Sequence, residues 1–151
     1  MSRKSQPSPA DAFVHNRAIG FLLAQAHNRV RARMVAALGE GPLHLGHVVL
    51  LSSLYAQNDL TQVQLTQMSG IEKSSVVLFL DALEKDGWVE RRAHATDRRA
   101  HAVHLTRKGR ARFEEIGVRL AAAETDAMSP LSATERKQLE ALLLRLIAHL
   151  C

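Results

Sequence analysis

The chain has 151 residues, of which 46% are hydrophobic but only 4% aromatic, and its formal net charge at pH 7 is +5. This composition suits one domain with a core built mainly from Leu, Ala and Val, and the positive charge favours a polyanionic partner. The apolar runs are too short to span a bilayer or form a signal peptide, and a lone cysteine, Cys151, excludes an intrachain disulfide, so we expect a cytoplasmic protein without membrane contact.

The first part of the chain predicts a lead-in followed by two helices. Residues 1–10 contain two Pro and three Ser, which predicts a disordered segment ahead of a single domain over 11–151. Apolar residues then recur at three- and four-residue steps, which predicts a helix over about 11–38. The sequence GEGP (39–42) ends that helix because its glycines tolerate open conformations and its proline cannot continue it. The apolar segment 43–57 predicts a buried second helix.

Two further helices joined by a tight turn are predicted next. Thr61 and Gln64 make a capping box for a short helix, which we expect to bury Val63, Leu65 and Met68. Ser69 and Gly70 form the turn, and Glu72 opens the next helix, whose expected inner face contains Val76, Leu80 and Leu83. Two helices joined by a short turn that contains Gly constitute a helix-turn-helix.

The remaining segments predict a β-hairpin and two more helices. Residues 88–92 and 100–106 have the composition and alternation of strands. Thr106 then caps a long helix, whose expected core face contains Phe113, Ile116, Leu120, Ala123 and Ala127. Ser132 and Glu135 make a capping box for a last helix, which carries one apolar stripe of Leu139, Leu142, Leu143, Leu146, Ile147 and Leu150.

Positive charge gathers in and around the hairpin. Residues 91–112 hold eight of the chain's 20 Lys and Arg residues and a single acid, Asp97. A hairpin that follows a helix-turn-helix makes a winged helix, in which the second helix enters the major groove of DNA and the hairpin reaches the backbone and minor groove. The connecting loop, residues 93–99, is slim enough for a minor groove about 6 Å wide, and that groove attracts arginine. We therefore expect Arg98 or Arg99 to enter it, positioned by Asp97.

The other DNA contacts are expected from the start of the second helix and from the basic residues beside the loop. Helix N-termini bind phosphate, and short polar or basic side chains there reach the backbone or base edges, which makes candidates of Lys73, Ser74 and Ser75. The candidates for phosphate contacts are Arg91, Arg92, Arg107, Lys108 and Arg110. The alternatives are a solvated charged hairpin and ordinary helix-start chemistry.

The second helix continues with Val77, Leu78 and Phe79, and the last two cannot donate hydrogen bonds to bases. Either these side chains face inward, or the protein reads few base edges and depends on thymine methyl groups, DNA shape and phosphates.

These motifs together carry a family resemblance. The segment LTQVQLTQMSGIEKSSVVLFLDALEKDGWVERRAHATDRRAHAVHLTRKGR resembles the winged-helix core of the MarR/SlyA family of bacterial transcriptional regulators. The shared pattern is Gly-Ile-x-Lys-Ser before the second helix, Leu-Glu-x-x-Gly-x-Val-Glu-Arg into the hairpin, Asp-x-Arg in the wing and Leu-Thr-x-x-Gly after it. By position, Asp97 and Arg99 match the wing motif, and Lys73, Ser74 and Ser75 match the opening of the recognition helix.

The resemblance implies a mainly α fold with a small β-hairpin wing and a regulator of transcription that binds double-stranded DNA. The winged helix-turn-helix would span about 43–106, and helices over about 11–38 and 107–151 would form the dimerisation region of a homodimer on a pseudo-palindromic operator. The resemblance also implies a repressor that is released by a small, often aromatic or phenolic, acid bound between the dimer helices and the winged unit. Polarity and rough location suggest four residues for that effector site: His15, Arg17, His44 and His47.

Other functions remain open at this level. His44 and His47 have a spacing that suits a metal pair, so a metal-responsive sensor or metal-binding module is the alternative, and a winged unit that contacts only protein is a third reading. No carboxylate or cysteine lies close to the two histidines, so we assign no metal ligands. No motif for catalysis or for a cofactor is present, and we expect neither enzymatic activity nor a cofactor.

Overall fold

The computed structural model describes residues 18–93 and 101–150. Six helices and three short strands follow one another in these residues. They are α1 (Ile19–Leu38), α2 (Leu45–Ala56), β1 (Leu60–Thr61), α3 (Gln62–Ser69), α4 (Lys73–Lys85), β2 (Val89–Ala93), β3 (His101–Leu105), α5 (Arg107–Ala127) and α6 (Ala133–Leu150). The prediction of a mainly α, winged helix-turn-helix fold is confirmed, whereas the predicted lead-in over 1–10 lies outside the described residues.

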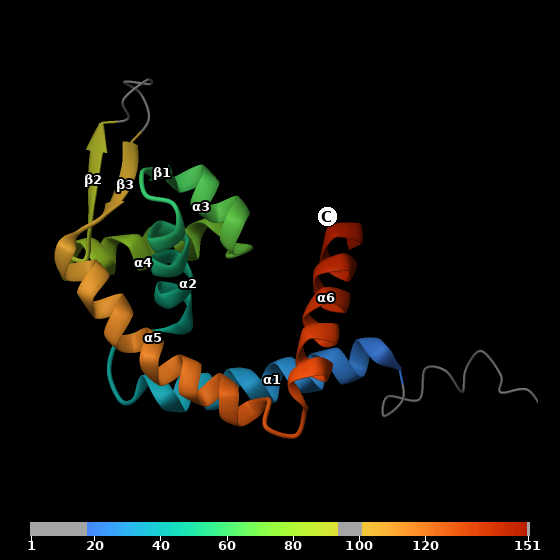
Figure 1. The fold of residues 1–151 in the computed structure, drawn as a ribbon. Helices are drawn as coiled ribbons and strands as arrows, with labels where there is room; N and C mark the ends of the chain where they lie inside the picture. Colours follow the sequence, from blue (N-terminus) through green and yellow to red (C-terminus); the bar gives the residue numbers. More distant parts are fainter. Residues whose placement is uncertain (1–17, 94–100, 151) are drawn as a thin grey trace, which may run out of the picture.

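The chain divides visibly into a winged unit and a set of long helices (Figure 1). Helices α2, α3 and α4 lie together beside the sheet, whose strand order is β1-β3-β2 with antiparallel pairing. Helix α5 starts at the foot of the hairpin and runs away from it to lie beside α1, and α6 then rises from the end of α5 apart from the winged unit (Figure 1). None of the described helices has the combination of length and hydropathy that a membrane span requires.

The core of the winged unit is aliphatic. Its buried side chains come from α2, α3, α4 and all three strands, and those with essentially no exposed surface include Leu50, Leu51, Leu54, Leu65, Leu80 and Val103. A smaller cluster of Leu38, Val48 and Ile116 joins α1, α2 and α5. Each fully buried Leu stabilises the fold by about 1.5–3 kcal/mol relative to an exposed position. These contacts hold α4 and the hairpin on one rigid support.

The predicted helix boundaries rest on caps that form as expected. The Thr61 side chain accepts from the Gln64 N–H at 3.2 Å, Gly70 ends α3 in the left-handed conformation, and Thr106 accepts from the Gly109 N–H at 3.0 Å. At α6, the N–H of Ser132 donates to the Glu135 carboxylate at 2.8 Å. Each such cap is worth about 1 kcal/mol.

Two details differ from the sequence prediction. In α3 only Leu65 is buried, while Val63 and Met68 are 62% and 53% exposed, because this short helix lies at the surface and turns only one face inward. Strand β1 was not predicted, since two residues are too few for an alternating pattern. Leu60 is nevertheless buried there, opposite Val103.

Candidate nucleic-acid interface and ligand groove

The recognition helix α4 is fixed by its inner face and exposed at its start. Val76, Leu80 and Leu83 are buried and form the predicted inner face of the helix. Lys73 and Ser74 are exposed in the first turn, whereas Ser75 is half-buried. The Ser74 hydroxyl donates to the Glu72 carboxylate, which stands at the N-cap. The first turn of α4 therefore presents a lysine and a serine to solvent.

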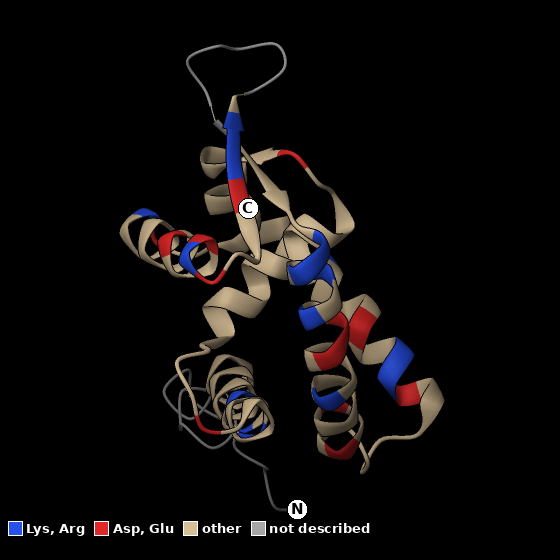
Figure 2. Ribbon diagram, turned by 90° about the vertical axis from the view of Figure 1, so that its left-hand side faces the viewer, with Lys and Arg blue, Asp and Glu red and all other residues tan. Residues whose placement is uncertain are grey.

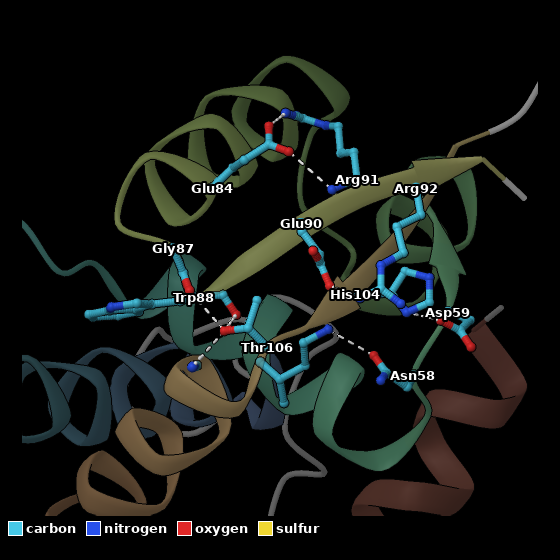
Figure 3. Close-up of polar contacts among 12 residues, drawn as sticks. Asn58, Asp59, Glu84, Gly87, Trp88, Glu90, Arg91, Arg92, His104 and Thr106 are labelled. Carbon is cyan, nitrogen blue, oxygen red and sulfur yellow. Dashed lines mark hydrogen bonds and ion pairs between the residues drawn. The ribbon is translucent and has the colours of Figure 1, made fainter.

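The base of the wing is tied to the winged unit from two sides (Figure 3). On one side the N–H of Leu105 donates to the Asn58 side chain at 2.8 Å, and the Asp59 carboxylate pairs with the His104 ring. On the other side the Thr106 hydroxyl donates to the Gly87 carbonyl at 2.8 Å. Strands β2 and β3 are in register from Val89 opposite Leu105 to Ala93 opposite His101. The contacts at the base of the hairpin therefore fix its orientation relative to the winged unit.

Arg91 is bound within the winged unit. Its guanidinium donates to Glu84 of α4 (Figure 3) and to Asp81 of the same helix at 2.6 Å. The Arg91 side chain is only 25% exposed. Burial alone would lower the pKa of Arg91, but the hydrogen bonds from the guanidinium to the two carboxylates outweigh it and raise that pKa. The prediction that Arg91 contacts phosphate loses support, because its charge is already neutralised and its donors link β2 to α4.

The other basic candidates are exposed beside the hairpin. Arg92 is 59% exposed and pairs with Glu90, and Lys108 donates to the Asp86 carbonyl at 2.7 Å. Arg110 lies over the Tyr55 ring at 4.5 Å, and Arg107 is exposed in the first turn of α5. Figure 2 shows Lys and Arg as blue segments on the outer half of β2 and at the start of α5. The predicted wing-tip residues Asp97, Arg98 and Arg99 lie outside the described residues.

His44 and His47, whose spacing would suit the alternative metal site, interact with each other at the start of α2. The Nδ1 of His47 accepts from the His44 N–H at 2.9 Å, which caps α2, and His47 is only 5% exposed. Burial, followed by the nearby His44 ring, lowers the pKa of His47, so its imidazole is neutral at pH 7. Within residues 18–93 and 101–150, no group of three or more His, Cys, Asp or Glu side chains is arranged to hold a metal ion. The structure thus gives His47 a role in holding the start of α2.

Phe79 connects this histidine pair to the recognition helix. Its ring meets the His47 ring edge-on at a centroid distance of 4.6 Å and lies against Gly46. A Cβ at Gly46 would stand 2.2 Å from that ring, so only glycine permits the contact. Phe79 therefore faces inward, which was one of the two possibilities that the sequence left open for Leu78 and Phe79. Leu78 does not, since it is 68% exposed.

A groove of about 850 Å³ opens between α1, α2, α4 and α6. This volume is typical of small-molecule sites. The walls are mainly apolar, and the polar groups on them include His27, Arg31 and His44, while Phe79 closes the side that belongs to the recognition helix. His47 instead lines a separate cavity of about 180 Å³ beside Trp88 and Arg112.

Of the four effector candidates, the structure thus places His44 on the large groove and His47 on the small cavity, while His15 and Arg17 lie outside the described residues. His27 and Arg31 were not predicted. They lie one turn apart on α1 and share a face of that helix with Val30 and Met34. This spacing is the sequence pattern that could have indicated a partly polar face on α1.

Comparison with known proteins identifies a family and several similar structures. The model of the MarR family matches residues 43–101. A probable transcriptional regulator from Pseudomonas aeruginosa is 30% identical, with 87% of this chain and 98% of that chain covered and a TM-score of 0.79.

Two similar structures were solved with ligands. The Mycobacterium tuberculosis MarR family protein Rv2887 in complex with salicylic acid is 26% identical, with 84% of this chain and 94% of that chain covered and a TM-score of 0.69. CouR from Rhodococcus jostii bound to p-coumaroyl-CoA is 25% identical, with 87% and 92% covered and a TM-score of 0.78.

Proposed function

Because the chain belongs to the MarR family of transcriptional regulators, we propose that it is a homodimeric repressor that binds a pseudo-palindromic operator and leaves it when a small aromatic acid binds. The observation that carries the proposal is a winged unit with an exposed recognition-helix start, attached to long helices whose apolar surface is uncovered. Residues of about 43–106 form the DNA-binding part, and about 11–38 and 107–151 form the dimerisation part.

The case for a dimer rests on α6. Not one of its 18 residues is buried, although many of them are apolar. The side chains of Leu142, Leu144, Ile147 and Leu150 are 55–74% exposed. At the start of α1, Ile19 is 73% exposed as well. Apolar patches of this extent are rare on monomeric proteins and mark interaction surfaces. The long helices of a second copy would cover both surfaces, which explains why they lie outside the winged unit.

In the proposed complex each subunit presents two elements to DNA. The start of α4, with Lys73 and Ser74, enters the major groove, and the wing places Arg98 or Arg99 in the minor groove. The proposed phosphate contacts come from Arg92 on β2 and from Arg107, Lys108 and Arg110 at the start of α5, at the foot of the hairpin. Twofold symmetry then gives two half-sites about one helical turn, roughly 34–36 Å, apart.

The wing is tested by Arg99→Ala. Removing two wing arginines from a dimer is expected to weaken operator binding at least about tenfold, because each lost groove contact costs about 1–3 kcal/mol. The melting temperature should not change. The measurement is a fluorescence-anisotropy titration of the operator duplex, with Arg29→Ala, an exposed substitution on α1, as the control. An Arg99→Ala protein that binds as tightly as the control contradicts the assignment of the wing.

The ligand is proposed to lie in the 850 Å³ groove, with its carboxylate near Arg31, His27 and His44. There the ligand would contact Phe79 of α4, so ligand binding would act directly on the position of the recognition helix. A ligand acts by preferring the state that cannot bind DNA. The salicylic acid bound by the similar Rv2887 supports an aromatic acid as the ligand class.

Salicylate is expected to raise the melting temperature by about 5–10 °C at a concentration roughly 100-fold above its Kd. Arg31→Ala should remove most of this shift, while Arg29→Ala, on the same helix but away from the groove, should retain it. The measurement is differential scanning fluorimetry, followed by release of the operator duplex. The groove assignment is wrong if Arg31→Ala responds like the unmodified protein.

A further inference from the structure

The outward face of α4 has an apolar centre. Ser74, Leu78 and Asp81 are spaced by four and three residues, which places them on one side of the helix, and all three are exposed. Leu78 is 68% exposed, while Val76 and Leu80 on the inner side are fully buried. This face is the one that the winged unit turns away from its core.

The two polar residues on either side of Leu78 already have partners within the protein. Asp81 accepts from Arg91 at 2.6 Å, and the Ser74 hydroxyl donates to Glu72. The Leu78 side chain has neither a hydrogen-bond donor nor an acceptor. The middle of the recognition helix therefore offers DNA an alkyl group where hydrogen bonds to bases would require a polar side chain.

A single exposed leucine is common on protein surfaces and by itself means little. The position of Leu78 is what matters. Several of the other strongly exposed aliphatic residues lie on α1 and α6, which belong to the proposed dimer surface, and Val63 lies on α3. Leu78, in contrast, lies on the outward face of the recognition helix α4 (Figure 1). The neighbouring Phe79 points to a different side of α4 and lies against Gly46, so α4 cannot rotate to bury Leu78 without displacing that ring.

In the major groove, the apolar feature of the base edges is the C5-methyl group of thymine. Resting on the function proposed above, we propose that Leu78 is a specificity-determining residue, which selects a thymine in each half-site by contact between its methyl groups and the C5-methyl. Cytosine at that position offers no methyl group, and the purines present polar atoms that Leu78 would leave without a hydrogen-bond partner.

The experiment removes the methyl group without altering base pairing. Duplexes recovered by selection from random DNA are resynthesised with deoxyuridine in place of thymine, at one symmetric pair of positions at a time, and titrated by fluorescence anisotropy. At one such pair, affinity is expected to fall by about fourfold per methyl group and so about 16-fold for the pair, the effect of exposing one buried methyl on each half-site.

The variant Leu78→Ala should bind the thymine and deoxyuridine duplexes equally, with an unchanged melting temperature because the side chain is exposed. Val63→Ala, which trims an equally exposed aliphatic residue on α3, should keep the full discrimination. The inference is overturned if no thymine is selected, if no uridine pair weakens binding, or if Leu78→Ala still discriminates. Binding of DNA without discrimination overturns this inference alone, whereas failure to retain any duplex also contradicts the proposed function.

Discussion

The substitution Leu146→Asp is expected to leave the protein monomeric at about 10 µM and to remove operator binding. Leu146 lies in the middle of the apolar stripe of α6 and is 38% exposed in the single chain. In a symmetric dimer the substitution places two unpaired carboxylates in the interface, and each costs several kcal/mol in desolvation. The dimer dissociation constant should therefore rise at least about a thousandfold, as measured by sedimentation equilibrium.

The control for this substitution is Gln138→Asp, which adds the same charge to an exposed polar position on the same helix. It should leave both the dimer and operator binding intact. If Leu146→Asp remains dimeric and binds DNA like this control, the apolar stripe of α6 does not form the interface.

The substitution Gly109→Ala is expected to destabilise the protein by about 3 kcal/mol, because overpacking against rigid neighbours costs this much. Gly109 lies in the first turn of α5, where an added Cβ would stand 2.0 Å from the Trp88 carbonyl oxygen. That carbonyl cannot retreat freely, since it accepts from the Thr106 N–H at 3.0 Å. Calorimetry should show a melting temperature lower by about 6–12 °C.

Gly117→Ala is the matched control for Gly109→Ala. Both glycines are in α5, but a Cβ at Gly117 meets no atom within 4 Å. Alanine has the higher helix propensity, so this control is expected to stabilise the protein by up to about 1 kcal/mol. Equal effects of the two substitutions would mean that the close approach between α5 and Trp88 does not restrict the residue at 109.

Features set by local sequence were predictable. The capping boxes at Thr61 and Ser132, the inner face of α4 and the strands of the hairpin require only neighbouring residues, and the structure has each of them within a residue or two. Strand β1 could not be predicted, because it exists only where Leu60 meets Val103, more than forty residues away. The exposure of Val63 and Met68 likewise depends on where α3 lies and not on its own pattern.

The candidate site was predictable in position but less so in the roles of single residues. The order of elements sufficed to place α4 and the wing next to one another. Whether a given arginine remains available for DNA depends on carboxylates brought near it by folding: Arg91 is neutralised by Asp81 and Glu84, and nothing in the local pattern marks these as partners across two elements. In the same way, Arg31 and His27 become groove residues only because α1 lies beside segments that are distant in the sequence.

The central claim is that the two winged units of a homodimer are held rigidly enough to bind adjacent turns of one DNA duplex. It is tested most directly by selecting bound fragments from random duplex DNA with the purified protein and sequencing them. We expect enrichment of two inverted half-sites whose centres are about 10–10.5 base pairs apart. Fragments without enrichment, or an enriched motif that occurs only once and without inverted symmetry, would contradict it.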